Sequence, residues 1–363
     1  MNTISLCLIV KNEEEVIGRC LKSVHQVVDE IIIVDTGSTD RTKEICLEYT
    51  NKIFDFEWIN DFAAARNFAF SYATMDYIFW LDSDDVLLLE DCQKLKTLKE
   101  LLDPAVDSVT MVYCLAQDKH GNMTSSNRRN RLVKRLNKFQ WRGFVHEYLD
   151  VAGNILNSDI VVFHKPLKHH NSDRNITIYK QRLEKGEEFS PRDLYYFANE
   201  WLDHGLYEQA VEYYEKFLDT KQGWIEDKIA ACGKLADCFH HLDNTEREMY
   251  YTLKAFEYDT PRADSCCRMG YGFMQHSEWE KAVFWYRLAT ELKIPKDNWG
   301  FLNHACWTWL PHLQLCVCFY QLGEYEYAYK HNGIAGRFIP DDEKVLYNQR
   351  LLEALLGRNK TVE

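Results

Sequence analysis

The sequence has no long hydrophobic run, no excess of basic residues and no cysteine pair with the Cys-x-x-Cys spacing. No stretch approaches the roughly 18 uninterrupted apolar residues of a membrane-spanning helix. The apolar residues 1–10 are followed at once by charge, from Lys11 on, which indicates a buried first strand and not a signal peptide. A formal net charge of −13 argues against nucleic acid as the main partner, because a phosphate backbone requires a basic surface.

The 12 cysteines are scattered through apolar runs, and no Cys-x-x-Cys occurs. This pattern favours buried free thiols in a reducing cytosol over disulfides or a structural zinc site. Hydrophobic residues make up 46% and charged residues 27% of the chain, which is typical of a soluble globular protein. The length of 363 residues is comfortable for two domains, so we expect a cytoplasmic protein with two cores.

The first half of the chain alternates strand and helix signals. Such an alternation predicts an α/β domain with a mostly parallel sheet, whose functional groups lie at the carboxyl ends of the strands. Apolar runs predict strands at 4–10, 30–34, 77–81 and 160–164, and helical spacing or composition predicts helices at 14–28, 41–49 and 63–73.

The second half of the chain shows internal repeats and no strand signal. An aromatic residue, a small residue, a second aromatic and an alanine recur at the same offsets from Trp201, Phe273 and Phe319, with a weaker copy from Phe239. This pattern resembles the tetratricopeptide repeat, a pair of helices joined by a tight turn. We place the turns at positions 205, 243, 277 and 323, inserts around 295–311 and a capping helix at 341–356. An irregular helical bundle is the alternative.

The strongest chemical signal is the run FWLDSDD at residues 79–85. A strand leads directly into Asp82 and Asp84, and like charges at a strand end repel one another unless a cation lies between them. Hard oxygen ligands suit Mg²⁺ or Mn²⁺ held to a diphosphate. The alternative is a solvated acidic turn or the start of a helix.

Three further segments accompany this run in chain order. SLCLIVKNEE (5–14) ends the first strand, IVDTGSTD (33–40) ends the second, and DFAAARN (61–67) opens a helix. Together with the Asp-x-Asp, these segments resemble the family 2 glycosyltransferases over roughly residues 3–170. A dinucleotide-binding Rossmann site is rejected, because residues 10–14 contain no glycine.

The resemblance implies a Rossmann-like GT-A catalytic domain at residues 1–180 that binds a UDP-sugar. It also implies a role for several residues. Asp35 hydrogen-bonds the base, usually uracil, Val10, Asn12 and Glu13 line the nucleoside pocket, Arg66 reaches the nucleotide, Asp82 contacts ribose or metal beside Ser83, and Asp84 binds the metal. A carboxylate accepts the uracil N–H and a guanidinium suits phosphate oxygens. The alternatives are a turn-forming Asp35 and a surface arginine at position 66.

A block of basic residues follows between Asp118 and Glu147, where eight lysines and arginines occur without an acid. The block either balances the diphosphate, attracts an acidic acceptor or forms a solvated loop. It ends in WRGFVHE (141–147), which resembles a segment of the family 2 subset whose catalytic domain precedes helical repeats.

Inverting transfer requires a base that deprotonates the acceptor, and Glu147 is our candidate. His146 could orient this base or line the site. His164, at the end of a predicted strand, is expected to complete the metal site, as a histidine does in related GT-A enzymes. His169 and His170 are competitors for that role, and an ordinary structural histidine is the alternative.

The second predicted domain, residues 191–363, is all-α, and repeat arrays offer a concave surface suited to a peptide. The two domains together resemble bacterial peptide and protein glycosyltransferases, including those that modify bacteriocin cysteines. The sequence therefore predicts inverting, metal-dependent transfer from a donor of the UDP-glucose or UDP-N-acetylglucosamine type to a Ser, Thr or Cys side chain. An envelope-glycan or lipid-linked acceptor, a non-catalytic repeat scaffold and a homodimer formed through the repeats remain open.

Overall fold

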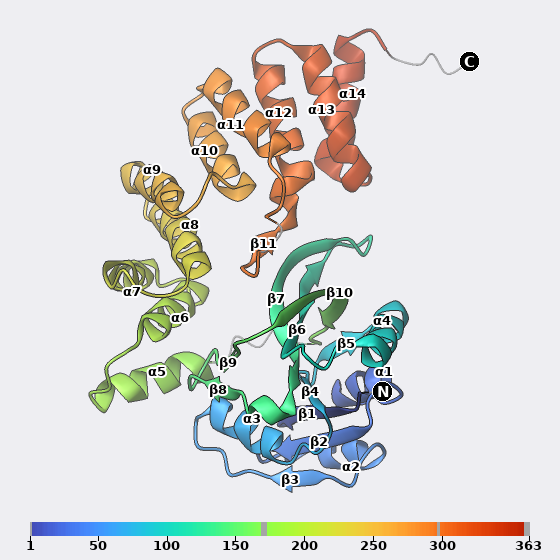
Figure 1. The fold of residues 1–363 in the computed structure, drawn as a ribbon. Coiled ribbons are helices and arrows are strands. Elements are labelled where there is room, and N and C mark those ends of the chain that lie inside the picture. The colour runs from blue at the N-terminus through green and yellow to red at the C-terminus, as the bar shows by residue number, and fades with distance from the viewer. Residues whose placement is uncertain (1, 168–172, 296–297, 359–363) are drawn as a thin grey trace. The chain divides into compact units, whose positions relative to one another are not determined.

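The protein divides into two compact units, residues 1–188 and 189–363. A computed structural model describes residues 2–167, 173–295 and 298–358 (Figure 1). The first unit contains a β-sheet with helices, and the second consists almost entirely of helices. Within these described ranges, no helix is both long enough and apolar enough to cross a membrane.

The first unit is built on one mixed sheet. Its strands are β1 (Ile4–Val10), β2 (Glu30–Asp35), β3 (Ile53–Asp55), β4 (Tyr77–Trp80), β5 (Asp85–Leu87), β6 (Ser108–Gln117), β7 (Met123–Lys134) and β10 (Ile155–His164), and β8 (Gln140–Arg142) and β9 (Tyr148–Asp150) form a separate hairpin. The strand order is β3-β2-β1-β4-β7-β6-β10-β5. Only β7 and β5 run against their neighbours, so the predicted mostly parallel sheet is confirmed.

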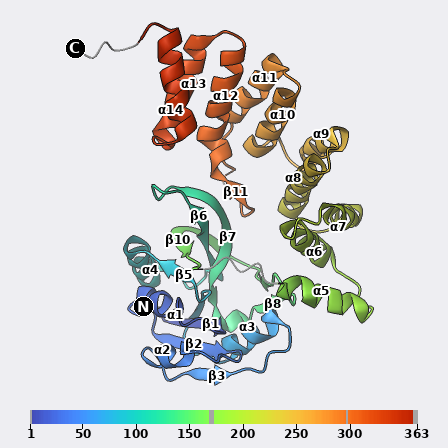
Figure 2. The ribbon, with the colours of Figure 1, turned by 180° about the vertical axis from the view of Figure 1, so that it is seen from behind.

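Helices cover both faces of this sheet (Figure 2). They are α1 (Ile17–Val24), α2 (Thr42–Leu47), α3 (Phe62–Ser71) and α4 (Leu89–Leu101). The unit also contains α5 (Arg174–Glu184) and a 3₁₀ turn at Arg135–Asn137. Leu6 and Leu8 of β1 pack into one core with Leu21 of α1, whereas Cys7 packs into another with Phe70 of α3. Because successive strand side chains point to opposite faces, a strand covered on both faces is apolar along its length.

The basic block does not form a solvated loop, because most of it belongs to β7 and the segments that flank it. Arg128 donates from Nη1 to the carbonyl of Ser158 at 2.7 Å, and the Nη1 of Arg131 lies 2.9 Å from Oδ2 of Asp85. These basic side chains therefore serve contacts inside the first unit. No strand was predicted over β6 or β7 from the sequence. In β7 polar residues interrupt the apolar pattern, whereas β6 is mostly apolar and was overlooked.

The second unit consists of successive helix pairs and a final helix (Figure 1). The pairs are α6 (Pro191–Asp203) with α7 (Tyr207–Asp219), α8 (Ile225–His241) with α9 (Thr245–Lys254), α10 (Ala263–Gln275) with α11 (Trp279–Glu291), and α12 (Trp309–Gln321) with α13 (Tyr325–Phe338). The last helix is α14 (Glu343–Leu355), and short elements lie at Ala255–Glu257, Leu302–Asn303 and His304–Trp307. The predicted repeat fold is confirmed, including the capping helix.

The turns within the four pairs share one backbone geometry. Gly205, Asp243, Ser277 and Gly323 all adopt the left-handed conformation, with φ between 54° and 77°. In each turn the next residue donates its N–H to a carbonyl five positions earlier, as in the 2.9 Å bond from the residue after Gly323. This is the hydrogen-bond pattern of a helix ending in a left-handed residue, and it explains why small or turn-forming residues recur at these positions.

The alanines of the repeat pattern lie at the contact between paired helices. Ala210, Ala282 and Ala328 are completely buried, and so is Tyr214 four residues after the first of them. A larger side chain at these alanine positions would overpack the contact, because interiors are close-packed. The repeating small residues therefore set how closely the two helices of a pair approach.

The turn geometry gives a stability prediction. Gly323→Ala should lower the free energy of unfolding by about 1–2 kcal/mol, because a left-handed residue with a Cβ is strained by that amount. A Cβ at this position would meet no atom within 4 Å, so the effect would come from the backbone alone. The converse change at an equivalent turn, Ser277→Gly, should not destabilise the protein. Denaturant unfolding measures the free energy of unfolding of both variants. An equal loss of stability in the two variants would contradict the prediction.

Candidate active site

The predicted site residues lie where parallel strands end. Val10 ends β1 and Asp35 ends β2, and these two residues are direct partners in the sheet register. Asp82 follows β4, which is the other parallel neighbour of β1. The carboxyl ends of these adjacent strands therefore bring three separate sequence segments to one edge of the sheet.

Asp35 is almost fully buried, at 1% exposure, and shapes the turn that follows β2. Its carboxylate accepts the N–H groups of Gly37 at 3.1 Å and Ser38 at 3.0 Å, and the Nζ of Lys43 lies 3.4 Å away. Gly37 has a φ of 102°, a conformation that favours glycine. Asp35 thus has the turn-forming role of the alternative interpretation, and its contact with a nucleotide base stays a prediction.

Asn12 joins the segment after β1 to the segment after β2. Its Oδ1 accepts the N–H of Thr39 at 2.8 Å, and its own N–H donates to Oγ of Ser38 at 3.0 Å. Asn12 has a left-handed φ of 56°, which asparagine tolerates better than most residues. The segments after β1 and β2, which are expected to form the nucleoside pocket, are therefore joined by hydrogen bonds.

Glu13 is close enough to the acidic residues after β4 for their charge to affect its pKa. Burial and then the negative charge of Asp84 raise the pKa of Glu13 to about 7, although a hydrogen bond with Ser83 opposes the shift. Ser83 is itself buried. The structure thus brings Glu13, Ser83 and Asp84 together, and the repulsion between the two carboxylates is of the kind that a bound cation relieves.

Arg66 connects two of the predicted carboxylates. Its Nη2 donates to Oδ1 of Asp82 and its Nε donates to Oε1 of Glu147, both at 2.6 Å. The guanidinium carbon lies 5.0 Å from the ring centre of Trp80 and 4.8 Å from that of Trp141. Arg66 is buried, at 8% exposure, and is not a surface arginine. Its contact with the nucleotide stays a prediction.

Two polar residues of the DFAAARN segment, Asp61 and Asn67, form hydrogen bonds that position α3 and the segment packed against it. Asp61 caps α3 by accepting the N–H of Ala64 at 2.8 Å. Asn67 donates from Nδ2 to the carbonyl of Trp141 at 3.1 Å and accepts the N–H of Trp141 at 2.8 Å. Sequence reasoning assigned no role to Asn67. These two bonds hold the WRGFVHE segment against α3, which lets Arg66 reach Glu147.

The Asp82 carboxylate lies in the field of several arginines. Burial alone would raise the pKa of Asp82, but the charges of Arg66, Arg131 and Arg129 outweigh it and hold that pKa well below its usual range. Asp82 is therefore ionised and hydrogen-bonded to Arg66. Its predicted contact with ribose or metal is not tested by this geometry.

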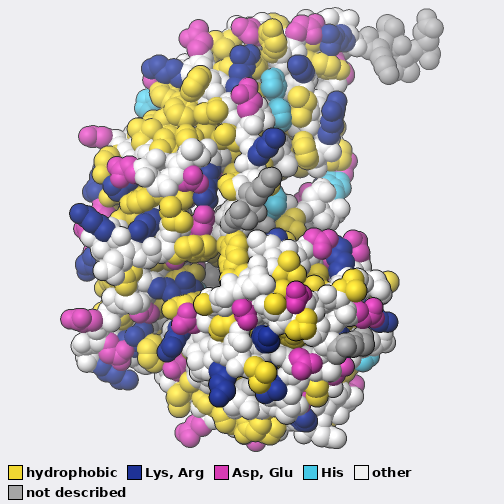
Figure 3. Space-filling model, in the orientation of Figure 1, with side chains coloured by type: hydrophobic (Ala, Val, Ile, Leu, Met, Phe, Trp, Pro, Cys, Tyr) yellow, Lys and Arg dark blue, Asp and Glu magenta, His cyan; other side chains and the backbone are white. Residues whose placement is uncertain are grey.

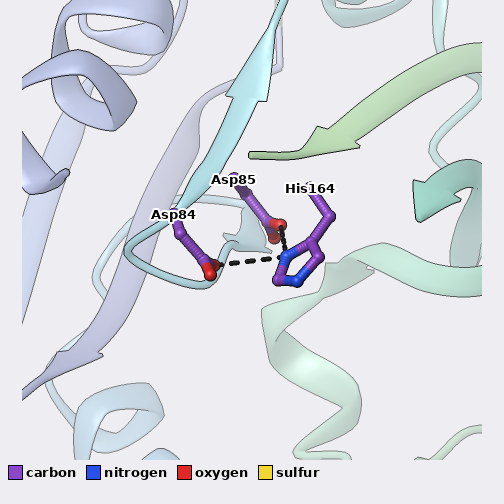
Figure 4. A group of neighbouring side chains, drawn as sticks. All are labelled: Asp84, Asp85 and His164. Carbon is purple, nitrogen blue, oxygen red and sulfur yellow. Dashed lines mark ion pairs between the residues drawn. The ribbon is translucent and has the colours of Figure 1, made fainter. Parts of the chain in front are cut away.

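A second group combines Asp84, Asp85 and His164 (Figure 4). Nδ1 of His164 lies 3.5 Å from Oδ1 of Asp84 and 3.9 Å from Oδ1 of Asp85, and the three potential ligand atoms all lie within 4.8 Å of one another. Burial lowers the pKa of His164, but hydrogen bonds and charges from the two aspartates outweigh it and raise that pKa to about 9. Two hard carboxylates and an imidazole suit Mn²⁺ or Mg²⁺.

The pairing of β5 with β10 creates this group. The two strands are antiparallel, and His164 is the register partner of Asp85. Sequence reasoning named Asp84 and His164 but not Asp85, because nothing local to the run showed that β5 would pair with a strand about 80 residues further along. His146 lies between β8 and β9 with a left-handed φ of 51°. The competing His169 and His170 lie outside the described residues.

Comparison with known proteins identifies the family. The sequence matches Glycosyl transferase family 2 over residues 5–163. It is 30% identical to a TPR repeat-containing protein of Synechococcus elongatus over 282 residues, which cover 67% of this chain and 69% of that protein. The chain belongs to the family 2 glycosyltransferases and is a transferase that combines a GT-A unit with tetratricopeptide-type helix pairs.

A second relative is the SPbeta prophage-derived glycosyltransferase SunS of Bacillus subtilis. It is 29% identical over 279 residues, which cover 70% of this chain and 63% of SunS, so the match spans less than two thirds of that relative. A solved glucosyl-3-phosphoglycerate synthase from Mycobacterium tuberculosis, in complex with Mn²⁺ and UDP-glucose, covers 52% of this chain and 81% of its own at 16% identity and a TM-score of 0.35. Values this low support no inference about ligands.

Proposed function

We propose that the chain transfers a sugar, with inversion, from a UDP-sugar of the UDP-glucose or UDP-N-acetylglucosamine type to a Ser, Thr or Cys side chain of a peptide or protein. The reaction depends on Mg²⁺ or Mn²⁺. The observation that carries the proposal is the bridge from Arg66 to Asp82 and Glu147, beside the group of Asp84 and His164. Arg66 thus links the base candidate, Glu147, to Asp82, which precedes the metal-ligand candidate Asp84 by two residues.

The donor binds at the ends of β1 and β2 in this proposal. Val10 and Asn12 line the nucleoside pocket, and Asp35 accepts the N–H of uracil. Asp84, Asp85 and His164 would hold the cation, with Ser83 and Glu13 beside them. A divalent cation in such a site neutralises charge on the leaving diphosphate.

Glu147 is the proposed base. Its side chain is only 11% exposed, and Arg66 fixes one carboxylate oxygen at 2.6 Å, which leaves the other free to accept a proton from the acceptor. Arg66 therefore orients Glu147, and the carboxylate is the form of this side chain that a base requires.

The acceptor is assigned to the repeat unit on chemical grounds. Hydrophobic side chains gather on the face of this unit that Figure 3 shows. Phe284 of α11 and Tyr347 of α14 are each 61% exposed, and exposed aromatic side chains of this kind are typical of surfaces that bind a polypeptide. A lipid-linked or glycan acceptor is the second candidate. The cysteines, all but one of them buried, suit the cytoplasmic location that we propose.

The nucleotide assignment is tested by base selectivity. UDP should bind more tightly than GDP or ADP, and Asp35→Ala should weaken UDP binding by about 1–3 kcal/mol, the usual value for a hydrogen bond to a charged group. Asp55→Ala is a matched control, because Asp55 is the register neighbour of Asp35 and contacts the same Lys43 but is 78% exposed. Calorimetry measures the affinities of the unaltered protein for UDP, GDP and ADP, and the UDP affinity of each variant. Tighter binding of GDP or ADP to the unaltered protein would overturn the uracil assignment.

A further inference from the structure

Aromatic rings and guanidinium groups alternate in a stack beside the candidate site. Each guanidinium carbon lies between 3.9 and 5.0 Å from the ring centres that flank it, as expected for cation–π contacts. The order of the stack is Trp141, Arg66, Trp80, Arg131, Tyr113 and Arg129. The stack joins α3, β4, β6, β7 and β8, which no single sequence segment connects.

Arg131 occupies the centre of this stack and is completely buried. Its Nη1 lies 2.9 Å from Oδ2 of Asp85, which is also completely buried, and donates to the carbonyl of Trp80 at 3.3 Å. Arg131 therefore contacts the last residue of β4 and the first residue of β5. The turn between these two strands carries Asp82 and Asp84.

Asp85 transmits the contact to that turn. The oxygen that faces Arg131 also accepts the N–H of Asp82 at 2.9 Å, and the N–H of Asp85 donates to the carbonyl of Asp82 at 3.0 Å. The turn from Asp82 to Asp85 is therefore closed by two hydrogen bonds. One of them depends on the oxygen that Arg131 fixes.

The Arg131–Asp85 pair is poorly explained as a device for stability. A buried ion pair seldom stabilises a protein more than apolar residues of similar volume would. In the described part of the chain, Nε and Nη2 of Arg131 are buried and have no hydrogen-bond partner, and unpaired buried donors lower the stability of the folded state. What the pair does provide is a fixed position for the oxygen that closes the acidic turn.

We infer that Arg131 is a positioning residue, which acts through Asp85 to hold the Asp82–Asp84 turn in the geometry that presents Asp84 to the cation and the diphosphate. This inference rests on the proposed metal-dependent use of a UDP-sugar. It assigns Arg131 no contact with substrate. Its effect should appear in the metal-dependent part of nucleotide binding and not in recognition of the nucleoside.

The test compares three variants of the full chain by calorimetry with UDP, in Mn²⁺ and in chelator, and with uridine alone. Arg131→Met should reduce the Mn²⁺-dependent gain in UDP affinity at least 10-fold, while uridine affinity stays within 2-fold of the unaltered protein. Arg131→Lys, which keeps a charge for Asp85 but not the planar stacking, should recover part of that gain. Arg128→Met is the matched control, because Arg128 is also on β7 but bonds Thr110 and Ser158 instead of a site residue. It should leave the gain unchanged.

The outcomes separate this inference from the proposed function. If the unaltered protein gains no UDP affinity from Mn²⁺, the metal role fails and this inference fails with it. If the unaltered protein gains affinity and folded Arg131 variants gain as much, Arg131 has only a structural role and the inference alone is overturned. Should Arg131→Met not fold, Arg131→Lys decides: a gain equal to that of the unaltered protein overturns the inference, and a reduced gain with normal uridine affinity supports it.

Discussion

Asp84→Asn is expected to reduce sugar transfer by at least about 100-fold, which is the usual effect of removing one group that stabilises charge in a transition state. Asparagine has the same shape as aspartate but lacks the negative charge that holds a divalent cation. The Asp84 side chain is 23% exposed, and its ion pair in the described structure is with His164. The free energy of unfolding should therefore change by only about 0.5 kcal/mol.

Release of UDP from UDP-sugars in the presence of Mn²⁺ measures this loss, and thermal unfolding confirms that the variant is folded. Asp159→Asn is the matched control, because Asp159 is 83% exposed and pairs with Lys94, away from the site. It should retain full activity. Equal UDP affinity of the unaltered protein with and without a chelator would contradict the metal role from which the prediction follows.

Glu147→Gln is expected to reduce transfer to a hydroxyl acceptor by about 10²–10⁴-fold, the range that general base catalysis contributes. Glutamine can keep a hydrogen bond to Arg66 but has no carboxylate to take the proton. A cysteine acceptor should lose less, because its pKa of about 8.5 leaves part of the thiol ionised near neutral pH. The size of the loss therefore distinguishes oxygen from sulfur as the accepting atom.

The comparison uses peptides that differ only in Ser, Thr or Cys at the acceptor position, with product detected by mass spectrometry. Glu44→Gln controls for the change of charge, because Glu44 of α2 is 71% exposed and pairs with Arg41. UDP affinity should stay within several-fold in both variants. Undiminished transfer to serine and threonine by Glu147→Gln would assign the base to another residue.

Structural features that are set by residues close together in the sequence, such as helices and turns, were predictable. Alternating strand and helix signals placed β1, α1, β2, α2, α3 and β4 in the right order, although α1 begins at Ile17 and not at residue 14, because apolar spacing does not fix the exact end of a helix. The repeat turns at Gly205 and Gly323 were placed correctly. A left-handed turn residue and a buried alanine leave a local signature that recurs with each helix pair.

The individual site residues were predictable to a lesser extent. Asp84 and His164 were named, and the structure brings them together. Asp82 was grouped with Asp84; its carboxylate bonds Arg66, and its contact with ribose or metal stays a prediction. Asp85, which was not named from the sequence, lies in the candidate metal group. In an acidic run of this kind, the sequence cannot show which carboxylate faces an arginine, because that depends on strands elsewhere in the sheet.

The sequence by itself determined the family, the two kinds of fold and the strand ends at which the chemistry lies, since each of these follows from short segments. Only the tertiary structure decided the pairing of charges. Arg66 and Glu147 are 81 positions apart, and Arg131 reaches Asp85 only because β7 lies beside β4. Such pairs depend on strand order and register, which are set by the packing of the whole sheet and are not encoded in any one segment.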